Sequence, residues 1–176
     1  MYGSRPQDLQ VIFGVDVNDL EAPVRQATAY STHLSYQIRQ HEEKDTGDIA
    51  LVRFEGGLPE GFRKAPLLTA AQAATALKTG KTVVLAGYGL SDGIKKTGAG
   101  ILRRVSVPIE DAKFSSTEIA MNQRLKRGAC HGDSGGPAYG VINNRLFLFG
   151  ITSRGHNDPL DTCGVTGIYT NMLAYS

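Results

Sequence analysis

The chain of 176 residues has no tryptophan, only two cysteines and no long uninterrupted apolar run. A membrane-spanning helix needs about 18 or more consecutive apolar residues, so the sequence predicts none. The start, MYGSRPQDLQ, lacks the basic and then apolar pattern of a signal peptide. A net charge of +2 without a basic cluster argues against nucleic-acid and membrane partners. We therefore expect one globular domain, residues 1–176, that binds neither nucleic acid nor membrane.

Glycine is in excess, at 21 of 176 residues, which is about 12% against a usual share of about 7%. Short β-branched and aromatic runs, bounded by Gly, Asp, Asn or Pro, are typical of strands. They lie at residues 9–15, 49–54, 83–88, 101–107 and 146–153. One segment differs, because Thr69 precedes the helix formers AAQAATALK and Gly80 follows them. The pattern predicts an all-β sandwich or barrel with one short surface helix.

The two cysteines, Cys130 and Cys163, lie 33 positions apart. His131 and His156 are near them in sequence, but no C-x-x-C or H-x-x-H spacing is present, so no metal site and no cofactor are predicted. A disulfide closing this loop would stabilise the fold by about 4 kcal/mol and would indicate an oxidising compartment. Two unpaired buried thiols remain the alternative.

The segment GDSGGP, residues 132–137, is the most informative stretch of the chain. Glycines around one serine usually mark a close approach of the backbone to another group. A nucleophilic serine needs such a turn, with backbone N–H groups directed at the carbonyl oxygen that it attacks. Ser134 is therefore a candidate nucleophile, and a polar glycine-rich turn without chemistry is the alternative.

The same segment also satisfies G-x-S-x-G, the nucleophile elbow of α/β-hydrolases. In that fold a helix follows the serine, and the acid and then the histidine come later in the chain. Here Pro137 follows closely and no helical pattern begins. The only later histidine, His156, precedes the candidate acids Asp158 and Asp161. The nucleophile-elbow interpretation therefore fails, because no helical pattern follows the serine and the histidine precedes the candidate acids.

The GDSGGP segment resembles the active-site serine motif of the chymotrypsin/trypsin family of serine endopeptidases. Four further segments resemble family motifs and occur in the family's order: DIAL at 48–51, GYG at 87–89, SRG at 153–155 and GIYT at 167–170. The resemblance implies a chymotrypsin-like fold of two β-barrels. It also implies a serine-type endopeptidase that acts on protein or peptide substrates and is a target for proteinaceous inhibitors.

The resemblance assigns catalytic roles to individual residues. Ser134 is the expected nucleophile, and the N–H groups of Gly132 and Ser134 are the expected oxyanion hole. Asp48 would hold a histidine in the correct tautomer and stabilise its imidazolium. Asp133 would pair with the new N-terminus after activation.

The resemblance also implies a specificity pocket. Its base falls on Gly128, and its walls include Ala129, Gly155 and Gly167. None of these residues is charged, so a buried Lys or Arg of a substrate would find no partner there. Because three of the four are glycines, we expect an open slot that takes a medium or large apolar side chain.

The resemblance carries three further implications for residues near the pocket. Ser153–Gly155 would pair with the substrate backbone as a short antiparallel strand. Arg154 stands where the family usually has an aromatic residue, which favours acidic residues in the neighbouring part of the substrate. Cys130 and Cys163 match the family's disulfide across the pocket.

The general base is what the chain lacks. No T-A-A-H-C-like motif precedes Asp48, and His33 and His41 lie in polar contexts that indicate solvated surface positions. His131 falls at the lip of the pocket and His156 in a loop beyond Gly155. Neither position corresponds to the family's catalytic histidine.

We therefore expect a peptidase domain whose first barrel is incomplete, without its N-terminal strands and histidine motif, and almost inert by itself. A non-catalytic peptide-binding module and a fragment completed by a partner chain are the alternatives. The resemblance implies a secreted or periplasmic location.

Overall fold

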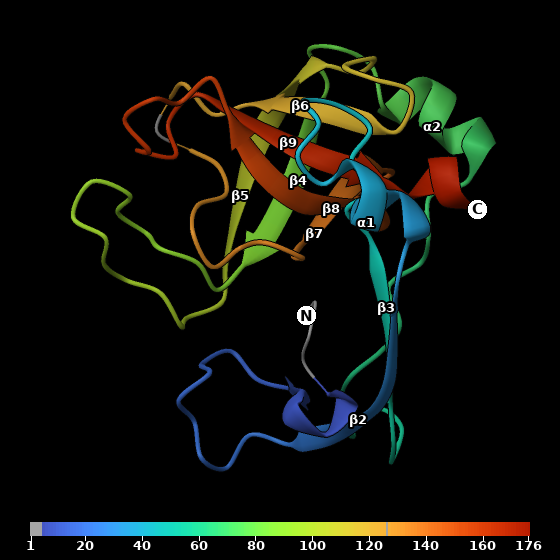
Figure 1. Ribbon diagram of the computed structural model, residues 1–176, viewed down its shortest axis with the longest axis vertical. Helices are drawn as coiled ribbons and strands as arrows, with labels where there is room; N and C mark the ends of the chain where they lie inside the picture. Colours follow the sequence, from blue (N-terminus) through green and yellow to red (C-terminus); the bar gives the residue numbers. More distant parts are fainter. Residues whose placement is uncertain (1–4, 126) are drawn as a thin grey trace. The chain divides into compact units, whose positions relative to one another are not determined.

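The computed structural model describes residues 5–125 and 127–176. Its chain divides into two compact units, Met1–Lys64 and Ala65–Ser176. Strands dominate both units, and the helices are short (Figure 1). Among the described residues, no helix is both long enough and apolar enough to cross a membrane.

The first unit contains an open, three-stranded antiparallel sheet in the order β1-β2-β3. Its elements are η1 (Pro6–Asp8), β1 (Gln10–Ile12), β2 (Val24–Thr32), α1 (Leu34–Arg39) and β3 (Ala50–Phe54). The ring of Phe13 lies edge-on to Phe54 and Phe62, with centroid distances of 5.8 and 5.1 Å. The expectation that the first barrel is incomplete is confirmed by this partial sheet.

The sequence predicts a single helix, and helix α1 is a second one that it did not predict. Its N-cap is His33, whose Nδ1 accepts a hydrogen bond from the Ser35 N–H at 3.2 Å. Histidine is not among the residues that usually cap helices, so no start signal for a helix is recognisable there.

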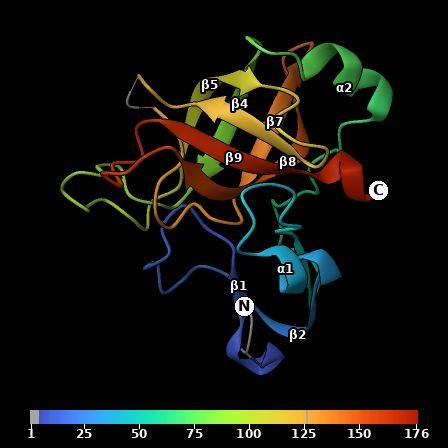
Figure 2. The same ribbon diagram turned by 45° about the horizontal axis from the view of Figure 1, so that its top comes forward.

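The second unit is a closed barrel in the strand order β4-β5-β6-β9-β8-β7, seen in Figure 2. Its elements are α2 (Ala70–Ala76), β4 (Thr82–Gly87), β5 (Arg103–Asp111), β6 (Glu118–Asn122), β7 (Pro137–Ile142), β8 (Arg145–His156), β9 (Thr166–Asn171) and η2 (Met172–Tyr175). All neighbouring strands are antiparallel, and pairing of β4 with β7 closes the barrel. This all-β architecture confirms the predicted fold class.

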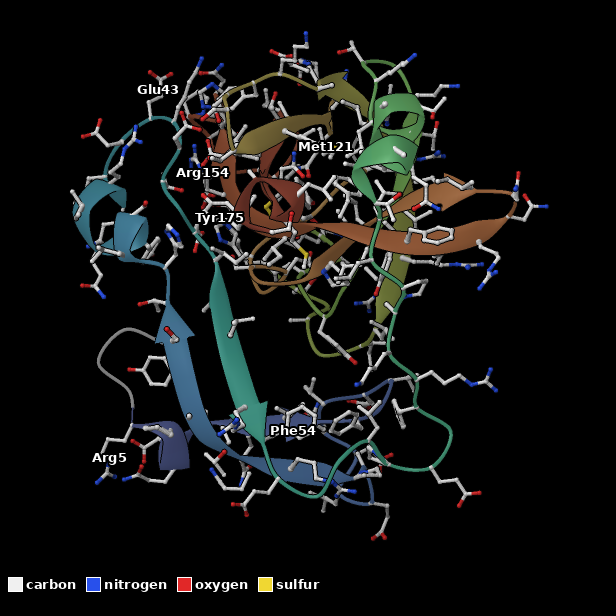
Figure 3. The ribbon with its side chains drawn as sticks, turned by 90° about the vertical axis from the view of Figure 1, so that its right-hand side faces the viewer. Arg5, Glu43, Phe54, Met121, Arg154 and Tyr175 are labelled. Atoms are coloured by element: carbon white, nitrogen blue, oxygen red, sulfur yellow. A yellow bond between two sulfur atoms is a disulfide. The ribbon has the colours of Figure 1, made fainter. Side chains whose placement is uncertain are left out.

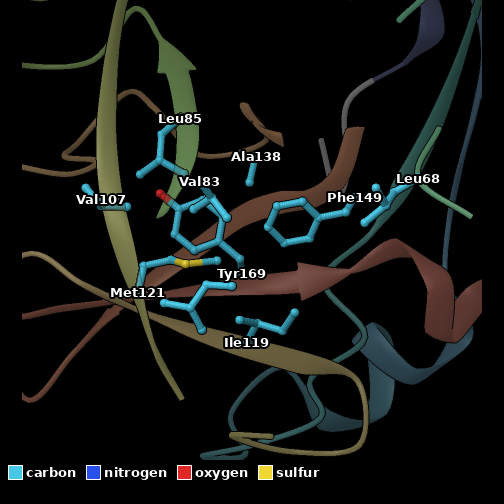
Figure 4. Close-up of a cluster of buried hydrophobic side chains, with 10 residues drawn as sticks. Leu68, Val83, Leu85, Val107, Ile119, Met121, Ala138, Phe149 and Tyr169 are labelled. Atoms are coloured by element: carbon cyan, nitrogen blue, oxygen red, sulfur yellow. The ribbon is translucent and has the colours of Figure 1, made fainter. Parts of the chain in front are cut away.

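The barrel interior is filled by apolar side chains from all of its strands (Figure 4). Alternate residues of β4 face inward, so Val83 and Leu85 are buried. The largest of the fully buried side chains are Tyr169 and Phe149. Burial raises the pKa of the Tyr169 phenol, so this ring stays neutral. The packed interior gives the loops at the barrel's ends a rigid support.

The five predicted strand runs correspond to β1, β3, β4, β5 and β8, and the predicted helix corresponds to α2. The strand pattern does not mark β2, β6, β7 or β9. Strand β2 consists mainly of alanine and polar residues, β6 begins with Glu118 and ends with Asn122, β7 begins with proline and contains Gly140, and β9 contains Gly167 and three polar residues. Pairing partners within the barrel, rather than strong local propensity, make these segments strands.

We expect Thr69→Ala to lower the free energy of unfolding by about 1 kcal/mol, because Thr69 caps helix α2. Its Oγ1 accepts the N–H of Gln72 at 3.3 Å, and Gln72 Oε1 accepts the N–H of Thr69 at 2.9 Å. Urea unfolding of both proteins measures the difference. Thr97→Ala, at an exposed threonine outside any helix, is the matched control and should change the value by less than about 0.5 kcal/mol. Equal losses in the two variants would contradict the capping role.

Candidate active site

A cleft of about 810 Å³ lies in the second unit, formed by β8, β9 and the loops near them. Its volume is in the range of small-ligand and peptide sites. Six of the predicted site residues line it: Ala129, Ser134, Ser153, Arg154, Gly155 and Gly167. Cys130 and Cys163 also line it and are joined by a disulfide, as the resemblance implies.

The turn that carries Ser134 is fixed by glycine conformations and by strand β8. Gly132 and Gly135 have φ values of +94° and +82°, which other residues adopt only at a cost. Gly135 donates its N–H to the Thr152 carbonyl, and Thr152 donates its own to the Gly136 carbonyl, both at 2.8 Å. The turn is therefore anchored to β8, while the Ser134 side chain stays exposed.

Two backbone donors beside Ser134 are available for a ligand. Within residues 5–125 and 127–176, no hydrogen bond engages the N–H of Gly132 or of Ser134. Two such donors can stabilise the negative charge that develops on a carbonyl oxygen during attack.

The Asp133 carboxylate ties this turn to the segment that contains Gly89. Its Oδ1 accepts the Gly89 N–H and its Oδ2 accepts the Cys130 N–H, each at 2.8 Å. A Cβ at Gly89 would lie 2.5 Å from Asp133 Oδ2, so this close approach requires glycine in the GYG segment. A second cavity of about 190 Å³, with Leu85 and Val105 in its lining, lies beside Asp133.

The base of the pocket differs from the sequence prediction. Gly128 does not line the cleft, and a Cβ there would overlap the side chain of Gln123. A Cβ at Gly167 would lie 2.6 Å from Gln123 Oε1, whereas one at Gly155 would meet nothing within 4 Å. The prediction that all three glycines leave the slot open is therefore wrong at Gly128, which does not line the cleft, whereas Gly167 lines the cleft and has Gln123 in the space beside it. Sequence reasoning missed Gln123, because a single glutamine after a strand carries no recognisable signal.

Arg154, labelled in Figure 3, lies on β8 and makes a bidentate ion pair. Its Nη1 and Nη2 donate to Glu118 Oε1 and Oε2 at 2.8 and 3.0 Å. Glu118 is only 1% exposed. Because the guanidinium charge is already paired, the expectation that Arg154 favours acidic substrate residues loses its basis.

The four histidines and Asp48 lie in different surroundings. His131 Nε2 pairs with Asp161 Oδ1 at 2.7 Å at the edge of the cleft. His156 is the last residue of β8 and its ring is 5.2 Å from that of Phe114, so the prediction that it lies in a loop is wrong. Asp48 belongs to the first unit, directly before β3, and is partly buried. His33 and His41 are exposed in that unit, as predicted.

Hydrogen bonds from Lys96 and then His131 hold the pKa of Asp161 below its ordinary value. Because the folded pKa is the lower one, the contribution of Asp161 to stability is present above the unfolded value, about 3.9, and is lost as pH falls through the folded value. A carboxyl NMR titration should give a midpoint for Asp161 below that of an unfolded peptide. Lys96→Met should raise the midpoint, and a midpoint that does not move would contradict the role of Lys96.

Comparison with known proteins identifies relatives along the whole chain. The family model for trypsin matches residues 2–176. Trypsin-1 of Astacus astacus is 29% identical, with 95% of this chain and 72% of that protein covered. Transmembrane protease serine 11C of Mus musculus is 29% identical, with 98% and 41% covered. Inactive CLIP domain-containing serine protease A3 of Aedes aegypti is 23% identical, with 73% and 30% covered. The chain thus spans less than half the length of the last two relatives.

Proposed function

The chain belongs to the trypsin family of serine proteases, and from this premise we propose that it hydrolyses peptide bonds through an acyl-enzyme on Ser134. The observation that carries the proposal is the exposed Ser134 beside two backbone N–H groups that have no partner among the described residues. The Ser134 Oγ attacks the scissile carbonyl, and the N–H groups of Gly132 and Ser134 stabilise the oxyanion. The C–N bond then breaks as the protonated base gives its proton to the leaving amine, and water hydrolyses the ester, which releases the carboxylic acid and restores the Ser134 hydroxyl.

The proton of Ser134 has to be taken by a general base, which Asp48 would orient. None of the chain's four histidines matches the family's base by sequence context. Loss of the histidine from such a triad costs about 10⁶ in turnover and leaves about 10³–10⁴ over the rate in water. The chain by itself is therefore nearly inactive, and only slow acylation of Ser134 is expected.

Asp133 supports a further part of the proposal. Its carboxylate borders the second cavity, whose lining combines the apolar Leu85 and Val105 with Arg103, Arg104 and Arg127. An ammonium group there would pair with Asp133, as the family resemblance implies for an activated N-terminus.

The substrate is a protein or peptide with an uncharged residue at the cleaved position. The walls at Ala129, Gly155 and Gly167 carry no charge. Of the carboxylates that line the cleft, Asp161 pairs with Lys96 and Asp158 accepts the Gly164 N–H at 3.2 Å. A buried Lys or Arg would therefore compete with existing contacts. A panel of chromogenic peptides tests this, and faster turnover with Arg than with Leu or Phe would overturn it.

Labelling with a fluorophosphonate tests the nucleophile directly. The chain should be labelled at Ser134, and Ser134→Ala should abolish labelling, with the site read out by mass spectrometry. His131→Ala is the matched control and should leave the labelling rate within about twofold, because His131 pairs with Asp161 and not with the nucleophile. Because the general base is missing, labelling should be slow, and absence of labelling after prolonged exposure of the folded chain to excess probe would contradict the proposed acyl-enzyme.

A non-catalytic peptide-binding module is the second candidate function. It is favoured by the missing base and by similarity to a relative whose name describes it as inactive. It predicts that the cleft binds peptides while Ser134 resists the fluorophosphonate. The same labelling experiment, combined with a peptide titration, separates the two candidates.

We further propose a secreted or periplasmic location, where proteinaceous inhibitors are plausible partners. The Cys130–Cys163 disulfide supports it, because such bonds persist in oxidising compartments. Mass spectrometry of the protein from its native source, after alkylation of free thiols, tests it. Two alkylated cysteines in the native protein would contradict it.

A further inference from the structure

Gln123 occupies an unusual place for a polar side chain. It follows β6 directly, is only 3% exposed, and yet forms part of the lining of the cleft that contains Ser134. A buried amide needs partners for its donors and its acceptor.

The Gln123 carboxamide joins two segments that line the cleft, one at Ala129 and one at Cys163. Its Nε2 donates to the carbonyls of Ala129 and Cys163 at 3.1 and 3.0 Å, and its Oε1 accepts the Ala129 N–H at 2.8 Å. Both N–H donors are used, and one lone pair of Oε1 remains. These three hydrogen bonds hold the Gln123 side chain in one position, between Ala129 and Cys163.

The same carboxamide fills the space that two glycines leave. A Cβ at Gly128 would overlap the Gln123 side chain, and one at Gly167 would lie 2.6 Å from Oε1 and 3.0 Å from Cδ. The glycines therefore make room for Gln123 instead of leaving an empty slot. At Gly155, by contrast, the space stays open.

We propose that Gln123 is the specificity-determining floor of the pocket and limits how far a substrate side chain can enter. The pocket then takes a medium apolar side chain, such as leucine, in preference to a large aromatic one. The preference follows because a phenyl ring would press on a carboxamide that three hydrogen bonds hold in place. This inference rests on the proposed function for the identity of the cleft as the substrate site.

The test compares the affinities of the full chain for the peptide acids acetyl-Ala-Ala-Leu and acetyl-Ala-Ala-Phe, measured by NMR titration. The wild-type chain should bind the Leu peptide more tightly. Gln123→Ala deepens the pocket and should shift the ratio of the two dissociation constants at least tenfold toward Phe, the scale on which apolar pockets discriminate by one or two methylenes. Gln123→Met fills the same volume without the hydrogen bonds and should keep the wild-type preference.

Gln37→Ala, at an exposed glutamine of α1, is the matched control and should leave the ratio unchanged. If Gln123→Ala does not fold, Gln123→Asn should shift the ratio in the same direction by a smaller factor. An unchanged ratio in a folded Gln123→Ala or Gln123→Asn chain would overturn the inference, and so would an equal shift in Gln123→Met. Peptide binding with this pattern but without fluorophosphonate labelling would contradict only the proposed catalysis.

Discussion

Replacing Arg154 with alanine is expected to lower the free energy of unfolding by about 3–5 kcal/mol, because the change breaks a buried, bidentate ion pair. Glu118 is 1% exposed, and both of its carboxylate oxygens accept hydrogen bonds from Arg154. A carboxylate taken out of water is costly unless it is paired. Urea unfolding monitored by circular dichroism measures the loss.

The cost should come from the broken ion pair with Glu118 and not from the lost packing of the arginine side chain. The double variant Glu118→Leu/Arg154→Met removes both charges and should therefore recover most of the stability. Arg104→Ala, at an exposed arginine on β5, is the matched control and should change stability by less than about 0.5 kcal/mol. A loss below about 1 kcal/mol in Arg154→Ala would show that Glu118 finds another partner or becomes protonated.

Removing the disulfide is expected to cost about 4 kcal/mol in free energy of unfolding. The bond joins Cys130 to Cys163 across 33 positions, so breaking it restores much conformational freedom to the unfolded chain. The double variant Cys130→Ser/Cys163→Ser and the reduced wild-type chain should show similar losses in urea unfolding.

The disulfide also joins the two cleft-lining segments that Gln123 bridges by hydrogen bonds. Its loss should therefore weaken binding of the Leu peptide as well as stability. Adding reductant to the double serine variant is the control and should change nothing. Full stability of the reduced wild-type chain would contradict a structural role for the bond.

The sequence by itself determined the features that depend on local chemistry or on a contiguous motif. The GDSGGP turn predicted an exposed serine among glycines, and Gly132 and Gly135 do adopt positive φ values. Thr69 and the helix formers after it predicted α2, because a cap and its helix are local. The strand runs at β4, β5 and β8 predicted an all-β fold, since bulky alternating residues favour strands wherever they pair.

The tertiary structure alone decided which polar side chains complete the cleft. Gln123 reaches Cys163 across 40 positions, and Arg154 reaches Glu118 across 36. Neither pair has a motif or a fixed spacing, because closure of the barrel brings β6 alongside β9 and β9 alongside β8. The resemblance implied an open slot from the glycines at 128, 155 and 167. Only the packed barrel shows that the side chain of Gln123 occupies the space beside two of them.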